Sequence, residues 1–148
     1  MTDPIVKLEL IIIQNLLDVN NLKNEVEKKE FEKNDQLKEI CLRIIEILDS
    51  FEQIEESLTE KININNEDAK KIINRYTTIR KKLLSLLKKY GVTKIEFPNN
   101  RLIVGLCEVV EIEADNIRKN DEIISIVRNG YIRGKELIRA SQIVIVKN

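Results

Sequence analysis

The residues between 128 and 139 carry most of the recognition chemistry in this sequence. Four of these twelve residues are basic, and Glu136 is the only acid among them. Arg and Tyr are enriched among the side chains that dominate interface energies, and a basic patch favours an acidic partner surface. The pattern predicts a partner-binding surface with Arg139 and Tyr131 as its anchors. The predicted surface consists of Arg128, Tyr131, Arg133, Lys135 and Arg139.

Catalytic chemistry is hard to assemble from these residues. The chain has no histidine, which excludes Ser-His and Cys-His nucleophiles and the commonest zinc ligand. Cys41 and Cys107 stand alone in apolar patterns, without metal-ligand spacing, so we expect buried or half-buried thiols. The sequence contains no Gly-rich phosphate loop or EF-hand loop. We expect no enzyme activity, no metal and no cofactor; a small hydrolase or transferase that uses carboxylates alone is the remote alternative.

The composition also argues against nucleic-acid and membrane partners. The formal net charge is zero, only 4% of residues are aromatic and Trp is absent, which leaves little for phosphate contacts or base stacking. The apolar run from Leu8 to Leu17 is too short to span a bilayer and is followed by no cleavage signal. We therefore expect a soluble, cytoplasmic protein.

The first half of the chain has a helical hydrophobic period. Asp3-Pro4 reads as a cap and first helical residue, and large apolar residues then recur at sevens from Ile5 to Ile54, interrupted at Lys33. The simplest interpretation is one helix over residues 4–58, about 80 Å long at roughly 1.5 Å per residue. A small domain cannot cover such a helix, so it needs a partner chain.

A second helix is predicted over residues 66–90. The Asn-rich segment 62–66 reads as the break and cap before it, and Gly91 as the stop after it. Two antiparallel helices with more apolar surface than one chain can bury predict a homodimer that forms a coiled coil and a four-helix bundle. The predicted dimerisation residues are Ile40, Ile44, Ile47, Phe51, Ile54, Ile72, Tyr76, Ile79 and Leu83.

Beyond Gly91 the pattern becomes that of short strands. They are rich in β-branched residues and separated by Asn, Gly and Asp. The chain is therefore predicted to have an α+β fold, with a helical dimerisation region at 4–90 and a small all-β domain at 91–148. The strands are predicted at 102–104, 106–112, 122–127, 136–138 and 142–146.

Three motifs resemble the GrpE family, whose members are nucleotide exchange factors for DnaK-type chaperones. Gly130-Tyr131 and the stretch from Ile138-Arg139-Ala140 to Val146 resemble the C-terminal signature "GY...(L/I)R(P/A)A.V.V". The segment 83–92 resembles "LL..L...GV", and Ile47–Glu52 resembles "vlDn.er", with Ser50 and Gln53 departing from it. Before about Phe31 only the helical pattern matches.

The resemblance implies a paired long helix, a dimeric four-helix bundle and a compact β-domain that binds a DnaK-type ATPase domain. It also implies promotion of ADP release without a cofactor. One stretch departs: where the family usually reads "FDP..HEA", this chain reads Leu102–Val109, without the Asp-Pro turn and the His. We also expect the family's disordered N-terminal extension to be absent. A dimeric coiled-coil adaptor with the same fold and no exchange activity therefore stays open as the alternative.

Overall fold

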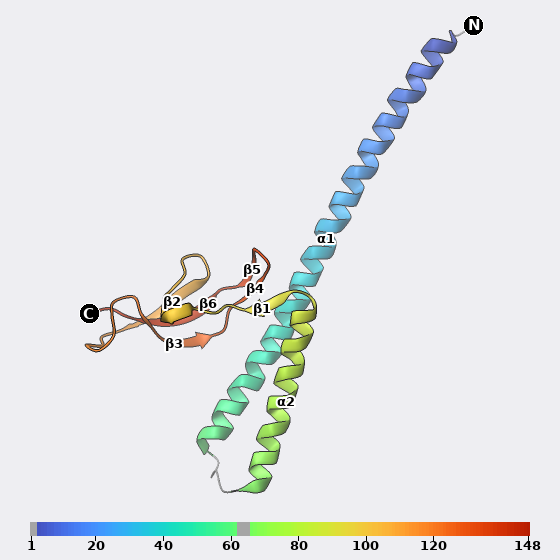
Figure 1. Ribbon diagram of the computed structural model, residues 1–148. Helices are drawn as coiled ribbons and strands as arrows, with labels where there is room; N and C mark the ends of the chain where they lie inside the picture. The colour runs from blue at the N-terminus through green and yellow to red at the C-terminus, as the bar shows by residue number, and fades with distance from the viewer. Residues whose placement is uncertain (1–2, 62–65) are drawn as a thin grey trace. The chain divides into compact units, whose positions relative to one another are not determined.

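The computed structural model of the chain describes residues 3–61 and 66–148, in two compact units that meet between Glu39 and Ile40. Helix α1 (Pro4–Lys61) passes through both units (Figure 1). It begins where the sequence predicts, because the Asp3 carboxylate accepts a hydrogen bond from the Ile5 amide at 3.0 Å. It ends three residues beyond the predicted Leu58. From Asp3 to Gln36 every residue is exposed, so this stretch of the helix buries nothing within its own chain.

Helix α2 (Glu67–Lys89) lies within one residue of its predicted bounds at each end. The side-chain oxygen of Asn66 caps it by accepting hydrogen bonds from the amides of Asp68 and Ala69. At the other end Gly91 takes φ 78°, and its amide donates to the Lys88 carbonyl oxygen at 2.9 Å. The rest of the predicted break, 62–65, lies outside the described residues.

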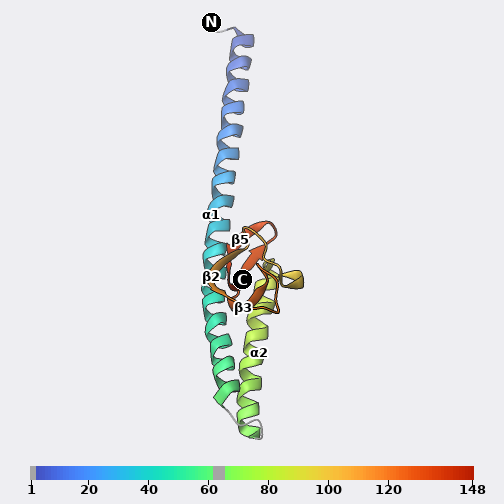
Figure 2. The ribbon, with the colours of Figure 1, turned by 90° about the vertical axis from the view of Figure 1, so that its left-hand side faces the viewer.

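Within the second unit, α2 runs back beside the last turns of α1 (Figures 1 and 2). The rings of Phe51 and Tyr76 lie 5.7 Å apart, and the Arg80 guanidinium pairs with the Glu55 carboxylate at 3.0 Å. Three α1 side chains are fully buried at spacings of four and three: Cys41, Ile45 and Leu48. This stripe is distinct from the predicted sevenfold row, which lies one residue earlier at Ile40 and Ile47.

Two small sheets follow the helices. The first has the order β1-β4-β5 and is antiparallel throughout; its strands are β1 (Val92–Lys94), β4 (Tyr131–Arg133) and β5 (Glu136–Arg139). The second has the order β2-β6-β3, with β2 parallel and β3 antiparallel to β6. Its strands are β2 (Cys107–Glu113), β3 (Ile123–Arg128) and β6 (Ser141–Val146), and a 3₁₀ turn, Pro98–Asn100, precedes it.

Four of the five predicted strands are present within two residues of their predicted ends. The prediction of a strand at 102–104 is wrong: these residues form an irregular turn that leaves Val104 exposed. Strands β1 and β4 were not predicted, because three residues are too few to show a period of two.

The β-domain core is built around β6, the central strand of its sheet. Its residues Ile143, Val144, Ile145 and Val146 are all buried, which explains why this strand reads as a continuous apolar run and not as an alternation. Ile143 and Ile145 pack with Ile123. Among the described residues, no helix is long and apolar enough to cross a membrane.

Candidate partner-binding site

Arg139, the predicted anchor, makes a bidentate ion pair with Asp49 of α1. Its Nη1 donates to Asp49 Oδ2 at 2.6 Å and its Nη2 to Asp49 Oδ1 at 2.8 Å. The two side chains are only 12% and 17% exposed. Parallel bonds between a guanidinium and a carboxylate are strong and directional. The pair therefore attaches the last hairpin of the β-domain to the long helix.

The remaining contacts of Arg139 keep its guanidinium in place. Its Nε and Nη2 both donate to the Asn129 carbonyl oxygen, at 3.0 and 2.6 Å. Its Cζ lies 5.6 Å from the centre of the buried Tyr131 ring, within range of a cation–π contact. Arg139 thus connects α1, the residues before β4 and the β4 ring.

Asp49 is the first of three acids along one side of α1, at intervals of three residues. The carboxylate of Asp49 also accepts from Arg128 Nε at 3.2 Å. Glu52 accepts from Asn129 Nδ2 at 3.0 Å and pairs with Lys94 Nζ at 3.0 Å. Glu55 forms an ion pair with Arg80 of α2. The acidic row on the helix is thereby matched by basic and amide groups from the β-domain and from α2.

Gly130, directly before β4, allows the backbone there to lie close to Arg139 of β5 and Ser141 of β6. A Cβ at this position would lie 2.4 Å from the Ser141 amide nitrogen and 2.7 Å from the Arg139 carbonyl oxygen. The Gly130 amide donates to the buried Ser141 hydroxyl at 2.8 Å. The requirement for glycine here is close packing against β6, and not the hairpin turn that the Gly-Tyr pair suggests on its own.

Burial raises the pKa of two enclosed titratable groups. It raises the pKa of the Tyr131 phenol far above its usual value, and the negative charges of Glu52 and Asp49 add to this effect. Burial also raises the pKa of the Cys41 thiol, against the opposing charge of Arg133. Both groups therefore stay neutral at neutral pH, and Cys41 packs as a core side chain.

The structure divides the five predicted partner-binding residues into two groups. Tyr131 is completely buried, and only 12% of the Arg139 side chain is exposed, which leaves the pair little surface for a partner in this conformation. Arg128 is exposed on one side of its pair with Asp49, and Arg133 pairs with Glu136 at 3.2 Å. Lys135 is exposed in the turn between β4 and β5. Arg128, Arg133 and Lys135 are thus the members that keep charge at or near the surface.

The predicted dimerisation residues also divide by exposure. Ile44, Phe51, Tyr76 and Leu83 are half-buried within the chain. The other five are 39% to 57% exposed: Ile40, Ile47, Ile54, Ile72 and Ile79. Each helix of the second unit therefore presents a row of large apolar side chains, seven residues apart, that its own chain does not cover.

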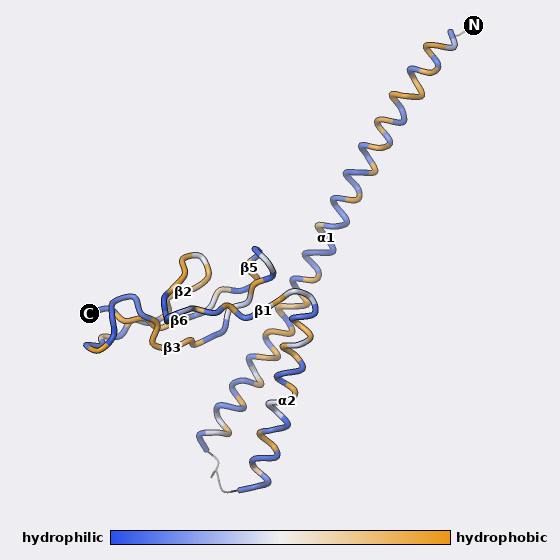
Figure 3. Tube along the Cα trace, viewed as in Figure 1, coloured by the Kyte–Doolittle hydropathy of each residue, from blue (hydrophilic) through white to orange (hydrophobic). Residues whose placement is uncertain are grey.

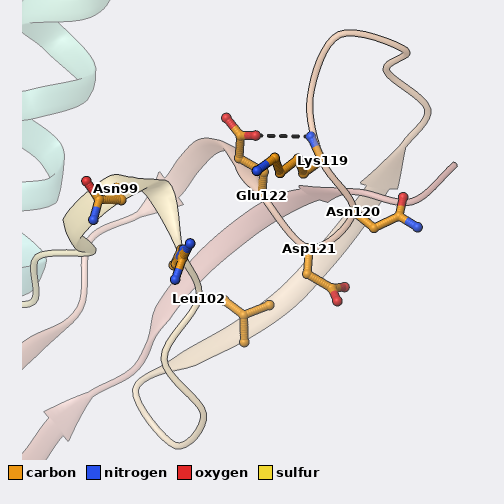
Figure 4. Close-up of a pocket in the computed structure, with 7 residues that line it drawn as sticks. Asn99, Leu102, Lys119, Asn120, Asp121 and Glu122 are labelled. Carbon is orange, nitrogen blue, oxygen red and sulfur yellow. Dashed lines mark hydrogen bonds between the residues drawn. The ribbon is translucent and has the colours of Figure 1, made fainter.

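A hollow of about 510 Å³ lies at the entry to the second sheet (Figure 4). Asn99, Arg101, Leu102 and residues 119–122 line it, and the Lys119 amide donates to the Glu122 carboxylate at 3.1 Å. All of these residues are exposed or half-buried, and their charges are mixed. Over residues 3–61 and 66–148, no cluster of three or more acidic or cysteine side chains is arranged to hold a metal.

The architecture defines the class of protein: an α+β protein in which a small β-domain packs against a long helix. The GrpE family model matches residues 3–147, and the chain belongs to the GrpE family. It is similar to Protein GrpE 2 of Buchnera aphidicola subsp. Schizaphis graminum, with 31% identity over 91% of this chain and 70% of that protein. Protein GrpE of Chlorobium phaeobacteroides is 21% identical over 95% of this chain and 75% of its own length. The resemblance drawn from the motifs is confirmed.

Asp49 and Glu52 are site residues that could not be recognised from the sequence. Both belong to the "vlDn.er"-like motif and Arg139 to the "R(P/A)A"-like motif, so the two family-like stretches are in direct contact. The one available signal was their opposite charge. A separation of 90 residues between Asp49 and Arg139 gives no periodicity that could reveal the pairing.

We expect strong coupling between Asp49 and Arg139 in the free energy of unfolding. Removing one member leaves a largely buried charge unpaired, so Asp49→Ala or Arg139→Ala should each cost about 3 to 5 kcal/mol. The double variant should recover roughly 1 to 3 kcal/mol of the summed loss. A double-mutant cycle by urea denaturation measures this coupling.

The exposed pair Arg43–Glu46, with side chains 69% and 53% exposed, is the matched control. Its coupling should stay below about 0.5 kcal/mol. Equal coupling energies for the two pairs would contradict the assignment of Asp49 and Arg139 as the attachment of the β-domain.

Proposed function

We propose that this chain is a nucleotide exchange factor that promotes ADP release from the ATPase domain of a DnaK-type chaperone. The observation that carries the proposal is the contact between the two family-like motifs, in a chain whose family match extends over residues 3–147. These motifs hold the β-domain in a fixed place on α1. A β-domain held in this way is a rigid element that a partner can bind without first ordering it.

The proposed mechanism is a shift of population and involves no reaction of the chain's own. The ATPase domain holds ADP between two lobes, and a protein that binds the open form better than the closed form favours opening and release. Arg128, Arg133 and Lys135 are the charges offered to an acidic partner surface. Arg139 and Tyr131 act as positioning residues beneath them. The free thiols of Cys41 and Cys107 suit a reducing cytoplasm.

We further propose that the chain works as a homodimer. The exposed rows on α1 and α2 have the spacing of a helix–helix interface, and a second copy would bury both rows at once. A dimer would also provide the stretch of α1 before Ile40 with a partner helix. The predicted domains, 4–90 for dimerisation and 91–148 for partner binding, are part of this proposal.

The alternative is a dimeric adaptor that has the GrpE fold but a different client. One observation favours it: the residues that replace the family's Asp-Pro pair lie in an irregular turn, in which Val104 is 91% exposed, and Cys107 stands at the His position, at the start of β2. A changed surface at this position could remove a chaperone contact while leaving the fold intact. The exchange assay below separates the two functions.

The chain should speed the release of a fluorescent ADP analogue from the DnaK-type chaperone of the same cell in stopped-flow measurements. Arg139→Ala should weaken binding by roughly 1 to 3 kcal/mol, because the β-domain loses its attachment. Lys135→Ala should cause a smaller loss. Arg43→Ala, a change of an exposed arginine on α1, is the control and should have no effect.

No acceleration by the wild-type chain at saturating concentration would favour the adaptor. If neither Arg139→Ala nor Lys135→Ala changes the acceleration of ADP release, the proposed function stands. In that case these two residues are not part of the partner-binding site.

Ile47→Asp should dissociate the dimer in sedimentation equilibrium. An unpaired carboxylate in an apolar seam costs several kcal/mol, whereas Ile47 itself contributes apolar burial. Ile112→Asp is the matched control, since Ile112 is 54% exposed, close to the 51% of Ile47, but lies on β2. A wild-type chain that stays monomeric at micromolar concentration would contradict the proposed dimer.

A further inference from the structure

Asn129 and Gly130 form the one Asn-Gly pair in the chain, and they lie directly before β4. Asparagine is a thermolabile residue, and a following glycine makes it most prone to deamidation, because no side chain hinders attack by the glycine nitrogen. In Figure 3 the tube turns from orange to blue where β3 ends, which marks the polar stretch at this pair. The proposed exchange function makes no use of the pair's reactivity.

The β-domain in its observed place holds the groups of this reaction in hydrogen bonds. The Gly130 amide, whose nitrogen would attack, donates to the buried Ser141 hydroxyl at 2.8 Å. The Asn129 Nδ2, which would leave, donates to Glu52 Oε2 at 3.0 Å. The Asn129 carbonyl oxygen accepts from Arg139 at 3.0 and 2.6 Å. Ring closure has to rotate the side chain and main chain of Asn129, so it must first break these bonds.

Two of these contacts depend on the attachment of the β-domain to α1. Glu52 belongs to α1, and Arg139 is held by Asp49 of the same helix. When the β-domain leaves α1, Asn129 loses its bond to Glu52, and Arg139 is no longer fixed beside it. A site protected in this way reacts through its open form, at a rate that follows the population of that form.

We propose that Asn129 is a deamidation site that the attachment of the β-domain protects, and that its modification keeps the β-domain from returning to its place on α1. In the open form the Gly130 nitrogen loses its proton and attacks Asn129 Cγ. A bond forms between these two atoms, the Cγ–Nδ2 bond breaks, and ammonia leaves with that proton. Water then opens the succinimide ring at either carbonyl, which gives aspartate or isoaspartate. No electron is transferred, and water is the only co-reactant.

Neither product fits the observed arrangement. Aspartate at position 129 replaces the donor to Glu52 by a second carboxylate, and Asp49 adds a further negative charge from the same helix. Isoaspartate lengthens the main chain by one carbon directly before Gly130, where even a Cβ would lie 2.4 Å from the Ser141 amide nitrogen. Deamidation therefore converts a reversible opening into a lasting one.

Incubation of the full chain at neutral pH, followed by trypsin digestion and mass spectrometry, measures the modification. Trypsin cuts after Arg128 and Arg133, so the fragment 129–133 carries the Asn-Gly pair and no other asparagine. The wild type should deamidate at least about tenfold more slowly than the chain unfolded in urea. Asp49→Ala should raise the wild-type rate at least about tenfold, because it populates the open form. Arg43→Ala, a change of an exposed arginine on α1, is the control and should keep the wild-type rate.

Ser141→Ala decides the matter if Asp49→Ala loses its fold in circular dichroism. It removes only the acceptor of the Gly130 amide, so it should speed deamidation about three- to tenfold with unchanged helix content. Asn129→Gln keeps an amide, but its longer side chain closes a ring much more slowly, and it should stay unmodified. A wild-type rate equal to that in urea would overturn the protected site. Wild-type rates in every folded variant would overturn it as well.

Asn129→Asp tests the consequence of the modification. Spin labels at the exposed positions 46 and 147, in a Cys107→Ser background, should give a broad distance distribution in this variant. Asn129→Ala removes the same donor without adding a charge, and its distribution should stay narrow. Mass and distance are read without any chaperone, so the result does not depend on the proposed exchange activity. Narrow distributions in both Asn129→Asp and the deamidated wild type would overturn the lasting effect.

Discussion

The structure of the second unit depends on the ion pair between Asp49 and Arg139. The β-domain has its own core around β6, so it does not need the helix to form its sheets. The helix is needed to fix where this domain lies. The pair meets that need because both side chains are largely buried and their hydrogen bonds are bidentate. The Asn129 carbonyl oxygen accepts from Arg139 as well, and Glu52 accepts from the Asn129 side chain. A hydrophobic contact alone would tolerate sliding, whereas the paired hydrogen bonds specify one register between the hairpin and the helix.

The same helix separates its tasks by face. Cys41, Ile45 and Leu48 pack inside the chain, and the acids Asp49, Glu52 and Glu55 bind the β-domain and α2. Ile40, Ile47 and Ile54 remain exposed, on the face that the proposed dimer would bury. Because these sets are offset by only one or two residues, each turn of α1 contributes to more than one contact. This arrangement explains how a moderately apolar helix supports a β-domain and a neighbouring helix and still has an exposed apolar row for the proposed dimer.

The helices and most of the second sheet could be predicted from the sequence, because their signals are local. Each of three signals predicts the structure of its own segment: the cap at Asp3, the helix-ending Gly91 and the apolar run of β6. The roles of Arg139 and Tyr131 could not be predicted in the same way. Arginine and tyrosine in a basic stretch have the composition of an exposed anchor, and only the distant Asp49 and Glu52 explain why they are buried. For the same reason the stripe at Cys41, Ile45 and Leu48 was missed beside the more regular sevenfold row.

Asp49 and Arg139 hold the β-domain in one position on α1. Electron spin resonance distances between labels at the exposed positions 46 and 147 test it most directly. The labels are placed in a Cys107→Ser background, and the labelled chain is diluted with unlabelled chain. We expect one narrow distance distribution for the wild type and a broad one for Asp49→Ala, with the β-domain still folded. An equally narrow and unshifted distribution in Asp49→Ala would contradict it.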